Sequence, residues 1–301
     1  MQETKAIMNV QAMEQAILAV LEIEIDHHYN ETTMDRKTRG FFGAPCVVIE
    51  DLWHRMQPLD DPAGQRIHLL WALVFLKVYS TEDVHCRLVG IKDPKTFRKW
   101  SWYMLSKIAG LKGSVIDFDK RFDGWDGHSN CLISVDGTDC PVNEPWPFDG
   151  KWYSKKFNGP AVKYEVGVCI QTGWIVWVNG PFLASTNDNT IFQQTLAGML
   201  SSDEGVEVDS GYGGHDALKT PTVAMSSLER KMKSVVRGRH ENVNGLLKVF
   251  NVLNVPFHHS NPRPKMMGKH GMCFDSIAVI TQLKLMRFGP NYDVQYDLLY
   301  E

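Results

Sequence analysis

Leu132-Ile-Ser-Val135 is an apolar run that leads directly into Asp136, and it predicts the first strand of a sheet. Residues 205–208 predict a later, short strand that ends in Asp209. Between them, alternating polarity predicts a strand at residues 164–170, and a tight-turn signal at 172–173 joins it to a second strand at 174–178. Helical spacing then predicts a helix at residues 188–200. The order is therefore three strands, a helix and a fourth strand.

This order of elements is that of an RNase H-like core, in which an antiparallel triplet of strands is followed by a crossover helix and a strand parallel to the first. The first and fourth strands are neighbours in that topology, so Asp136 and Asp209 converge at one end of the sheet. Two more helices are expected over residues 226–253 and 274–287. We therefore expect an α/β catalytic core over residues 131–301, with a mixed sheet and flanking helices.

The first 112 residues predict only helices. Apolar side chains recur at helical spacing over residues 12–25 and again over residues 64–79. We therefore expect an all-α N-terminal domain over residues 1–112. Residues 113–130 are dominated by Asp and Gly, and they predict a connector to the core.

Residues 81–110 predict a helix-turn-helix within this N-terminal domain. Thr81 is a suitable N-cap, Gly90 ends the first helix, and Asp93-Pro94 starts the second. Two helices that merely pack together would give the same pattern. If the motif binds DNA, its second helix lies in the major groove, and its candidate DNA contacts are Thr96, Arg98 and Lys99.

Composition places the chain among ordinary globular proteins. Its 301 residues suit about two domains, and its net charge of −3 argues weakly against a nucleic-acid binder, although groove binding needs only a local basic stripe. The six cysteines include no C-x-x-C pair and indicate reduced thiols in an intracellular protein. No secretory signal and no membrane-spanning stretch are visible. We expect a nuclear protein in a eukaryotic host and otherwise a cytoplasmic one, neither secreted nor bound to a membrane.

Asp136, Asp209 and Glu241 are the carboxylates that we expect to bind metal and to support catalysis. Cleavage of a phosphodiester requires charge to be stabilised on the attacking and leaving oxygens, and two Mg²⁺ ions about 3.5–4 Å apart do this well. Mg²⁺ is a hard cation that prefers carboxylate oxygens and water. Each residue also has a plainer interpretation, because either Asp fits a turn after a strand and Glu241 fits a surface ion pair.

The predicted helix around Glu241 has two faces. An apolar stripe is formed by Val236, Val243, Leu247 and Phe250, whereas Glu241 shares a polar stripe with Arg237, Asn244 and Lys248. Cations beside a metal-binding carboxylate suit an anionic substrate, so Arg237 and Lys248 are candidate DNA contacts. An ordinary surface helix with ion pairs would show the same pattern.

Residues 137–163 are rich in Pro, Gly, Trp and Lys, and they predict a long functional loop after the first Asp. Lys155 and Lys156 are candidate DNA contacts because aromatic side chains are interleaved with the lysines here, and such pairs can hold backbone and stack bases. A solvated loop anchored by its aromatic residues is the alternative. A basic run at residues 230–239 fits DNA binding, a nuclear signal or a solvated helix face.

Five short motifs follow one another along residues 135–250. They are Val135-Asp-Gly-Thr-Asp-Cys140 with Glu144-Pro145, Lys163-Tyr-Glu-Val166, Gly180-Pro181 with Asn187-Asp188, Val208-Asp-Ser-Gly-Tyr212, and Arg239-His-Glu-Asn-Val-Asn-Gly-Leu-Leu-Lys248-Val-Phe250. Together they make residues 133–285 resemble the PIF/Harbinger-like DDE transposases, which are DDE superfamily endonucleases. One departure is His240, because an aliphatic residue more often precedes the acid in that family.

The resemblance implies an RNase H-like fold, the triad Asp136, Asp209 and Glu241, and two divalent cations per site, Mg²⁺ or Mn²⁺. It implies a transposase that cuts transposon ends and joins them to target DNA as a homo-oligomer. Members of that family can depend on a separate Myb-like DNA-binding protein. Two alternatives stay open: a domesticated DNA-binding derivative without cleavage activity, and an RNase H-like nuclease that does not transfer strands.

Overall fold

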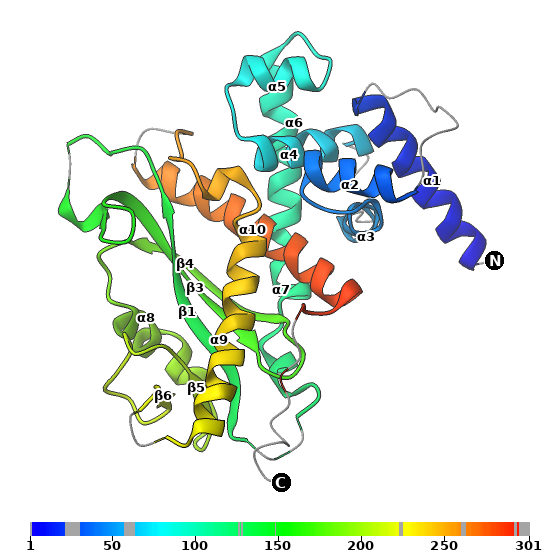
Figure 1. Cartoon of the computed structure of the whole chain (residues 1–301). Helices are drawn as coiled ribbons and strands as arrows, with labels where there is room; N and C mark the ends of the chain where they lie inside the picture. The colour runs from blue at the N-terminus through cyan, green and yellow to red at the C-terminus, as the bar shows by residue number, and fades with distance from the viewer. Residues whose placement is uncertain are drawn as a thin grey trace. The chain divides into compact units, whose positions relative to one another are not determined.

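The computed structural model describes residues 2–21, 31–56, 64–125, 127, 129–147, 149–222, 225–259, 263–291 and 294 (Figure 1). The chain divides into two compact units. The first comprises Met1–Val115, Val249–Asn254 and Met272–Arg287, and the second comprises Ile116–Lys248, Val255–Gly271 and Phe288–Glu301. No helix within the described ranges is both long and apolar enough to cross a bilayer. The domain bounds expected from the sequence stay a prediction.

The first unit is helical, which confirms the expected all-α N-terminal region. Its helices are α1 (Gln2–Leu21), α2 (Glu31–Phe42), α3 (Cys46–Met56), α4 (Arg66–Val78), α5 (Glu82–Leu88), α6 (Pro94–Gly110) and α7 (Lys112–Val115), with η4 (Asn251–Leu253) and the second part of α10 (Arg263–Phe288). The predicted helix at 64–79 corresponds to α4, whose residues 69–76 are all buried. The predicted helix at 12–25 begins earlier, as α1, and its residues 22–25 lie outside the described part of the chain.

The predicted pair of helices at 81–110 is also confirmed. Thr81 caps α5 by accepting a hydrogen bond from the Val84 amide (3.4 Å), and Asp93 caps α6 by accepting from two amides of its first turn (3.1 Å each). Gly90 lies between the helices with φ of 71°, a conformation that favours glycine. The buried Phe97 ring stacks on His85, with ring centroids 5.2 Å apart, and so holds α6 against α5.

The second unit contains the sheet. Its elements are η1 (Phe118–Phe122), β1 (Cys131–Pro141), η2 (Gly150–Trp152), β2 (Tyr153–Ser154), β3 (Gly159–Cys169), β4 (Ile175–Leu183), α8 (Asp188–Gln194), η3 (Leu196–Met199), β5 (Gly205–Glu207), β6 (Leu218–Lys219), α9 (Ser227–Leu247) and the first part of α10. The strands follow the order β2-β3-β1-β5-β6, and β4 also pairs with β3. β1, β3 and β4 form the expected antiparallel triplet, and β5 pairs parallel to β1. A mixed sheet with flanking helices, as in an RNase H-like core, is therefore confirmed.

Two expectations about the strand that carries Asp136 were wrong. β1 does not end there but continues to Pro141, and the predicted loop at 137–163 is largely occupied by the end of β1, by η2 and β2, and by the start of β3. Residues 137–141 pair in register with residues 161–165 of β3. Cross-strand pairing and burial therefore override the low strand propensity of their Gly, Asp and Pro.

Other helix bounds also differ from the sequence expectation. The predicted helix at 188–200 is split into α8 and η3, α9 ends at Leu247 instead of residue 253, and α10 begins at Arg263 instead of residue 274. The early start of α10 carries Gly268 and Gly271 and little apolar periodicity, so pattern alone could not find it.

The two faces of β1 have different partners. Ile133 and Val135 point into an apolar cluster with Phe192 of α8 and Leu196 of η3. The alternate residues, Ser134 and Asp136, face α9, which lies along the sheet (Figure 1). The period-two alternation of the strand thus places apolar side chains on the α8 side and polar side chains under α9.

Candidate active site

The parallel pairing of β1 and β5 brings Asp136 and Asp209 to the same level. Ser134 of β1 is in register with Glu207 of β5. Asp136 follows Ser134 by two residues, and Asp209 follows Glu207 by two. Since side chains alternate along a strand, both aspartates continue the face that lies under α9. The strand register therefore brings the two aspartates together just beyond the end of β5, although β1 continues past Asp136.

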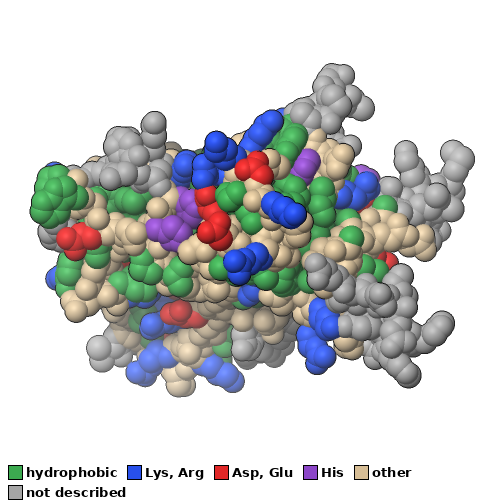
Figure 2. Space-filling view, turned by 90° about the horizontal axis from the view of Figure 1, so that it is seen from above, with side chains coloured by type: hydrophobic (Ala, Val, Ile, Leu, Met, Phe, Trp, Pro, Cys, Tyr) green, Lys and Arg blue, Asp and Glu red, His purple; other side chains and the backbone are tan. Residues whose placement is uncertain are grey.

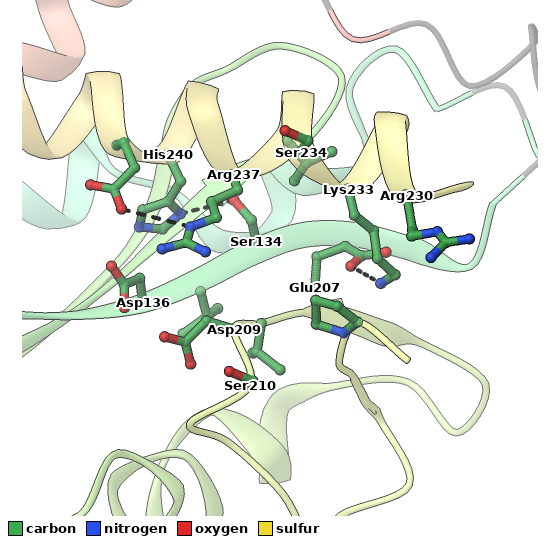
Figure 3. A pocket seen from close by; sticks show the side chains of 15 residues that line it. Ser134, Asp136, Glu207, Asp209, Ser210, Arg230, Lys233, Ser234, Arg237 and His240 are labelled. Carbon is green, nitrogen blue, oxygen red and sulfur yellow. Dashed lines mark hydrogen bonds and ion pairs between the residues drawn. The ribbon is translucent and has the colours of Figure 1, made fainter. Parts of the chain in front are cut away.

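A cavity of about 380 Å³ opens over this face. Asp136, Asp209 and Glu241 all line it, so the helix brings its carboxylate to the same cavity as the two strands. Figure 3 shows Asp136 and Asp209 on the sheet side, with the side chains of α9 above them. Three cations of α9, Arg230, Lys233 and Arg237, also line the cavity. Lys233 is engaged there in an ion pair with Glu207.

Both oxygens of the Asp136 carboxylate are held by protein groups. Oδ1 accepts a hydrogen bond from the Gly137 amide (2.8 Å), and Oδ2 accepts one from Nδ2 of Asn244 (3.3 Å). Burial and the neighbouring Asp209 raise the pKa of Asp136 to about 6, and Glu241 adds to this rise while Lys156 opposes it. The carboxylate thus lies in a field that disfavours its negative charge, and a cation placed there would relieve that cost.

Asp209 begins the turn after β5. Its Oδ1 accepts a hydrogen bond from the Gly211 amide (2.8 Å), which fixes an Asx-type turn. The side chain is exposed, in contrast to the half-buried Asp136. The structural interpretation of Asp209-Ser-Gly as a turn is therefore correct. The turn uses only Oδ1, so it does not exclude a second role for the carboxylate.

Glu241 is exposed, as Asp209 is. Its side chain is 60% exposed, and Oε1 lies 3.9 Å from Nε of Arg237, one turn earlier on α9. Within the described ranges, no group of three or more His, Cys, Asp and Glu side chains is arranged to hold a metal ion. The donor chemistry nevertheless fits a hard divalent cation, because the three carboxylates share one cavity and repel one another there. An exposed Glu side chain can reach a new rotamer at low cost once a cation competes with Arg237.

Four of the expected DNA contacts belong to the second unit, which contains the cavity. Lys155 and Lys156 are exposed in the turn between β2 and β3, and the charge of Lys156 acts on Asp136. Lys248 follows the last residue of α9, with Nζ 5.5 Å from the centre of the Phe157 ring. Arg237 is exposed beside Glu241. Of these four cations Arg237 lines the cavity, and all four stay predicted DNA contacts.

One residue of the basic run at 230–239 has a structural role instead. Arg239 is buried, and its guanidinium donates to the carbonyl oxygen of Ile170. On the molecular face in Figure 2, Lys and Arg side chains are scattered among acidic, apolar and other side chains. This mixture of charges on one face agrees with the slightly negative net charge.

The candidate contacts of the predicted helix-turn-helix are all exposed on α6, but two of them already have hydrogen-bond or ion-pair partners. The Thr96 hydroxyl donates to Asp93 (2.6 Å), and the Arg98 guanidinium binds Glu82 of α5 through two nitrogens, with Nε 2.6 Å from the carboxylate. Lys99 lies over the Trp100 ring at 5.1 Å. Thr96 and Arg98 therefore stabilise the motif itself, and Lys99 is the side chain with the greater freedom to reach a phosphate.

Sequence reasoning missed how two residues of α9 are used. The helical pattern predicts Asn244 on the polar stripe with Glu241, whereas the structure buries it against Asp136. His240 is also buried, with Nδ1 2.9 Å from the Ser134 hydroxyl, and burial lowers its pKa to about 4. The two residues are one helical turn apart and fall at the spacing of the apolar stripe, a signal that could have identified them.

Packing explains why residue 137 is a glycine, which the sequence alone did not show. A Cβ atom at this position would lie 2.6 Å from Oδ1 of Asp188, whose carboxylate packs on the face of β1 opposite Asp136. Asp188 is held there by Lys163, with Nζ 2.9 Å from Oδ1. The strand next to Asp136 is therefore packed from behind by an ion pair, and only glycine leaves room for it.

Comparison with known proteins assigns this part of the chain. Residues 135–281 match the family model described as DDE superfamily endonuclease. Searches among curated proteins and among solved structures gave no match. The matched segment contains Asp136, Asp209 and Glu241, α9, and all of the sheet except the first four residues of β1. It therefore includes every residue that lines the cavity except Ser134. Residues 135–281 of this chain are therefore a DDE superfamily endonuclease domain, a domain that suggests transposase-like nuclease activity on DNA.

Proposed function

We propose that this chain is a PIF/Harbinger-like DDE transposase that cleaves DNA at transposon ends and transfers the strands to a target. One observation carries the proposal: Asp136, Asp209 and Glu241, which come from β1, from the turn after β5 and from α9, line a single cavity. The electrostatic effect of Asp209 and Glu241 on Asp136 supports the same site. The endonuclease domain at residues 135–281 supports DNA as the substrate.

In this proposal the three carboxylates hold the divalent cations, Mg²⁺ or Mn²⁺. Two such ions, when bound, stabilise negative charge on the attacking and leaving oxygens of the phosphodiester. Gly137 and Asn244 orient the Asp136 carboxylate through their hydrogen bonds. Four cations neutralise the phosphates of the bound strand in this proposal; they are Arg237 in the cavity lining, and Lys155, Lys156 and Lys248 outside it.

The helix-turn-helix of α5 and α6 provides a second DNA contact in this proposal, through Lys99 with Thr96 and Arg98 beside it. Transposition brings two element ends together, so the active form is a homo-oligomer on DNA. Because net charge is −3, a Myb-like DNA-binding partner would supply additional grip on the ends. These steps would take place in the nucleus of a eukaryotic host.

A domesticated DNA-binding derivative without cleavage is the second candidate, and one observation favours it. Glu241 is paired with Arg237, and no three-ligand metal cluster is present among the described residues. If this arrangement persisted with metal and DNA, the site could not hold the cations that cleavage requires.

The deciding experiment is cleavage of labelled element-end DNA by purified protein with Mg²⁺ or Mn²⁺, followed by transfer to a target plasmid. We expect cleavage and strand-transfer products from the wild type and neither from Asp136→Asn, Asp209→Asn or Glu241→Gln. The control is Asp203→Asn, which neutralises an exposed carboxylate outside the cavity. Cleavage without transfer would indicate a nuclease, and a wild type that stays inactive even with a partner protein would favour the domesticated derivative.

A further inference from the structure

Two hydrogen bonds, one buried and one partly buried, join α9 to β1. Nδ1 of His240 lies 2.9 Å from the Ser134 hydroxyl, and Nδ2 of Asn244 donates to Oδ2 of Asp136 at 3.3 Å. The three neutral side chains are strongly buried: Ser134 is 6% exposed, His240 4% and Asn244 9%. Figure 3 shows the bond between His240 and Ser134 bridging from the helix to the strand.

The spacing of these bonds matches the geometry of a strand against a helix. Ser134 and Asp136 are two residues apart on β1, a rise of about 6.7 Å. His240 and Asn244 are four residues apart on α9, a rise of about 6 Å. Because the two rises nearly agree, both bonds form in only one register of the helix along the strand. A slip of one helical turn would break both.

Burying the polar side chains of His240 and Asn244 on this face of α9 costs folding free energy. His240 and Asn244 lie among the apolar side chains of the buried helix face, Val236, Val243 and Leu247. Within the described structure, Nε2 of His240 and Oδ1 of Asn244 are buried and lack a hydrogen-bond partner. An apolar side chain would pack there without this penalty. The main effect of the two bonds is therefore to fix the register of α9 along β1, and their effect on stability is smaller.

Glu241 depends on that register. It lies on α9 between His240 and Asn244 and is the one carboxylate of the proposed triad that a helix carries. The position of α9 along β1 therefore sets how far Glu241 lies from Asp136 and Asp209. A displacement of about 1 Å at a reacting site can cost about 100-fold in rate.

We propose that His240 and Asn244 are positioning residues, which fix α9 in register on β1 and thereby place Glu241 opposite Asp136 and Asp209. This inference rests on the proposed function, because the register matters for assembling a divalent-cation site only if the three carboxylates bind cations. It does not require either residue to touch the cation or the DNA. Asn244 has the larger role because it also orients the Asp136 carboxylate.

Substitution by leucine tests this role without emptying the helix face. Asn244→Leu and the double variant His240→Leu/Asn244→Leu keep a side chain of similar size in an apolar setting, so we expect melting temperatures at or above that of the wild type. The control is Asn242→Leu, on the same helix two residues away, where the side chain is half exposed and bonded to Asn291. Binding of Mn²⁺ alone is measured by calorimetry. We expect the affinity to fall about 10- to 100-fold for Asn244→Leu, as for other residues that orient metal ligands, and to stay unchanged for the control.

A second measurement works without metal. In crystal structures of the metal-free wild type and double variant, we expect the Cα of Glu241 to move along β1 relative to that of Asp136. An unmoved Glu241 overturns the inference, and so does Mn²⁺ affinity that is equal in Asn244→Leu and in the control. A wild type that binds no Mn²⁺ overturns the proposed function instead, while the crystallographic comparison still decides whether the two residues set the register.

Discussion

Replacing Asp136 by Asn should stabilise the metal-free protein while abolishing its response to metal. The substitution removes one negative charge and nearly preserves shape. The Gly137 amide can still donate to the new side chain. Asn244 can turn its amide so that its buried, unpartnered Oδ1 accepts from the new Nδ2. The main change is therefore the loss of a charge that the metal-free cavity disfavours.

The size of the effect follows from the pKa of Asp136. Burial, with Asp209 second, raises this pKa from 3.8 to about 6. One pKa unit corresponds to about 1.4 kcal/mol, so an ionised Asp136 costs the folded state up to about 3 kcal/mol relative to an ordinary Asp. The pKa of Asp136 is higher in the folded than in the unfolded state, so protonation of this carboxyl stabilises the fold. That stabilising contribution is fully present below about pH 4. It is lost as the pH rises to about 6 and above.

The assay is thermal or urea unfolding in EDTA from pH 4 to 8, repeated with Mn²⁺. At pH 7.5 without metal, Asp136→Asn should exceed the wild type by about 1–3 kcal/mol, and its stability should lack the wild-type decline between pH 4 and 6. With Mn²⁺ only the wild type should gain stability, because a ligand that binds the folded state stabilises it. Asp203→Asn should behave as the wild type throughout. An Asp136→Asn variant that is less stable than the wild type by the same amount at every pH would show that the charge of Asp136 does not destabilise the metal-free protein.

Three further predictions concern other contacts. Lys248→Ala should weaken DNA binding and reduce by about one the slope of log affinity against log salt, measured by fluorescence anisotropy; an unchanged slope would remove this residue from the DNA contacts. Arg98→Ala should lower stability by at most about 1 kcal/mol through loss of its exposed ion pair in the helix-turn-helix, and a larger loss in melts would contradict a surface role. Gly137→Ala should cost about 1–3 kcal/mol because its Cβ meets Asp188, whereas Gly150→Ala, which meets nothing within 4 Å, should cost less; equal losses would contradict the packing.

The order of elements could be predicted because each strand carries its own local signal. The apolar run before Asp136 and the alternation at residues 164–170 mark β1 and β3, and β5 can be recognised before Asp209. The parallel neighbours β1 and β5 then follow from topology alone. This pairing brings two aspartates that are distant in the sequence into one candidate site.

Local signals failed where long-range pairing decides the structure. Residues 137–141 contain Gly, Asp and Pro, which suggest a loop, yet they extend β1 because β3 pairs with them. The burial of Asn244 was missed for a related reason. An Asn on a helix is usually solvated, and only its partner Asp136, 108 positions away, makes the buried position favourable. Neither contact can be seen in a window of neighbouring residues.

The state of Glu241 was also beyond the sequence. Its spacing from Arg237 allowed either a metal ligand or an ion pair within one helical turn, and the structure contains the ion pair at the edge of the shared cavity. Glu241 binds metal if the free energy gained from a cation exceeds the free energy of its ion pair with Arg237. An exposed ion pair of this kind contributes at most about 1 kcal/mol. The weak pairing makes Glu241 available to a metal.

The most direct test of the carboxylate site is a crystal of the wild-type protein soaked in Mn²⁺ and measured for anomalous scattering. The account predicts strong peaks in the cavity beside Asp136 and Asp209, with the Glu241 side chain turned from Arg237 toward them, and no such peaks in Asp136→Asn. A wild-type cavity that stays without an anomalous peak at saturating Mn²⁺, or Mn²⁺ bound only to other residues, would contradict it.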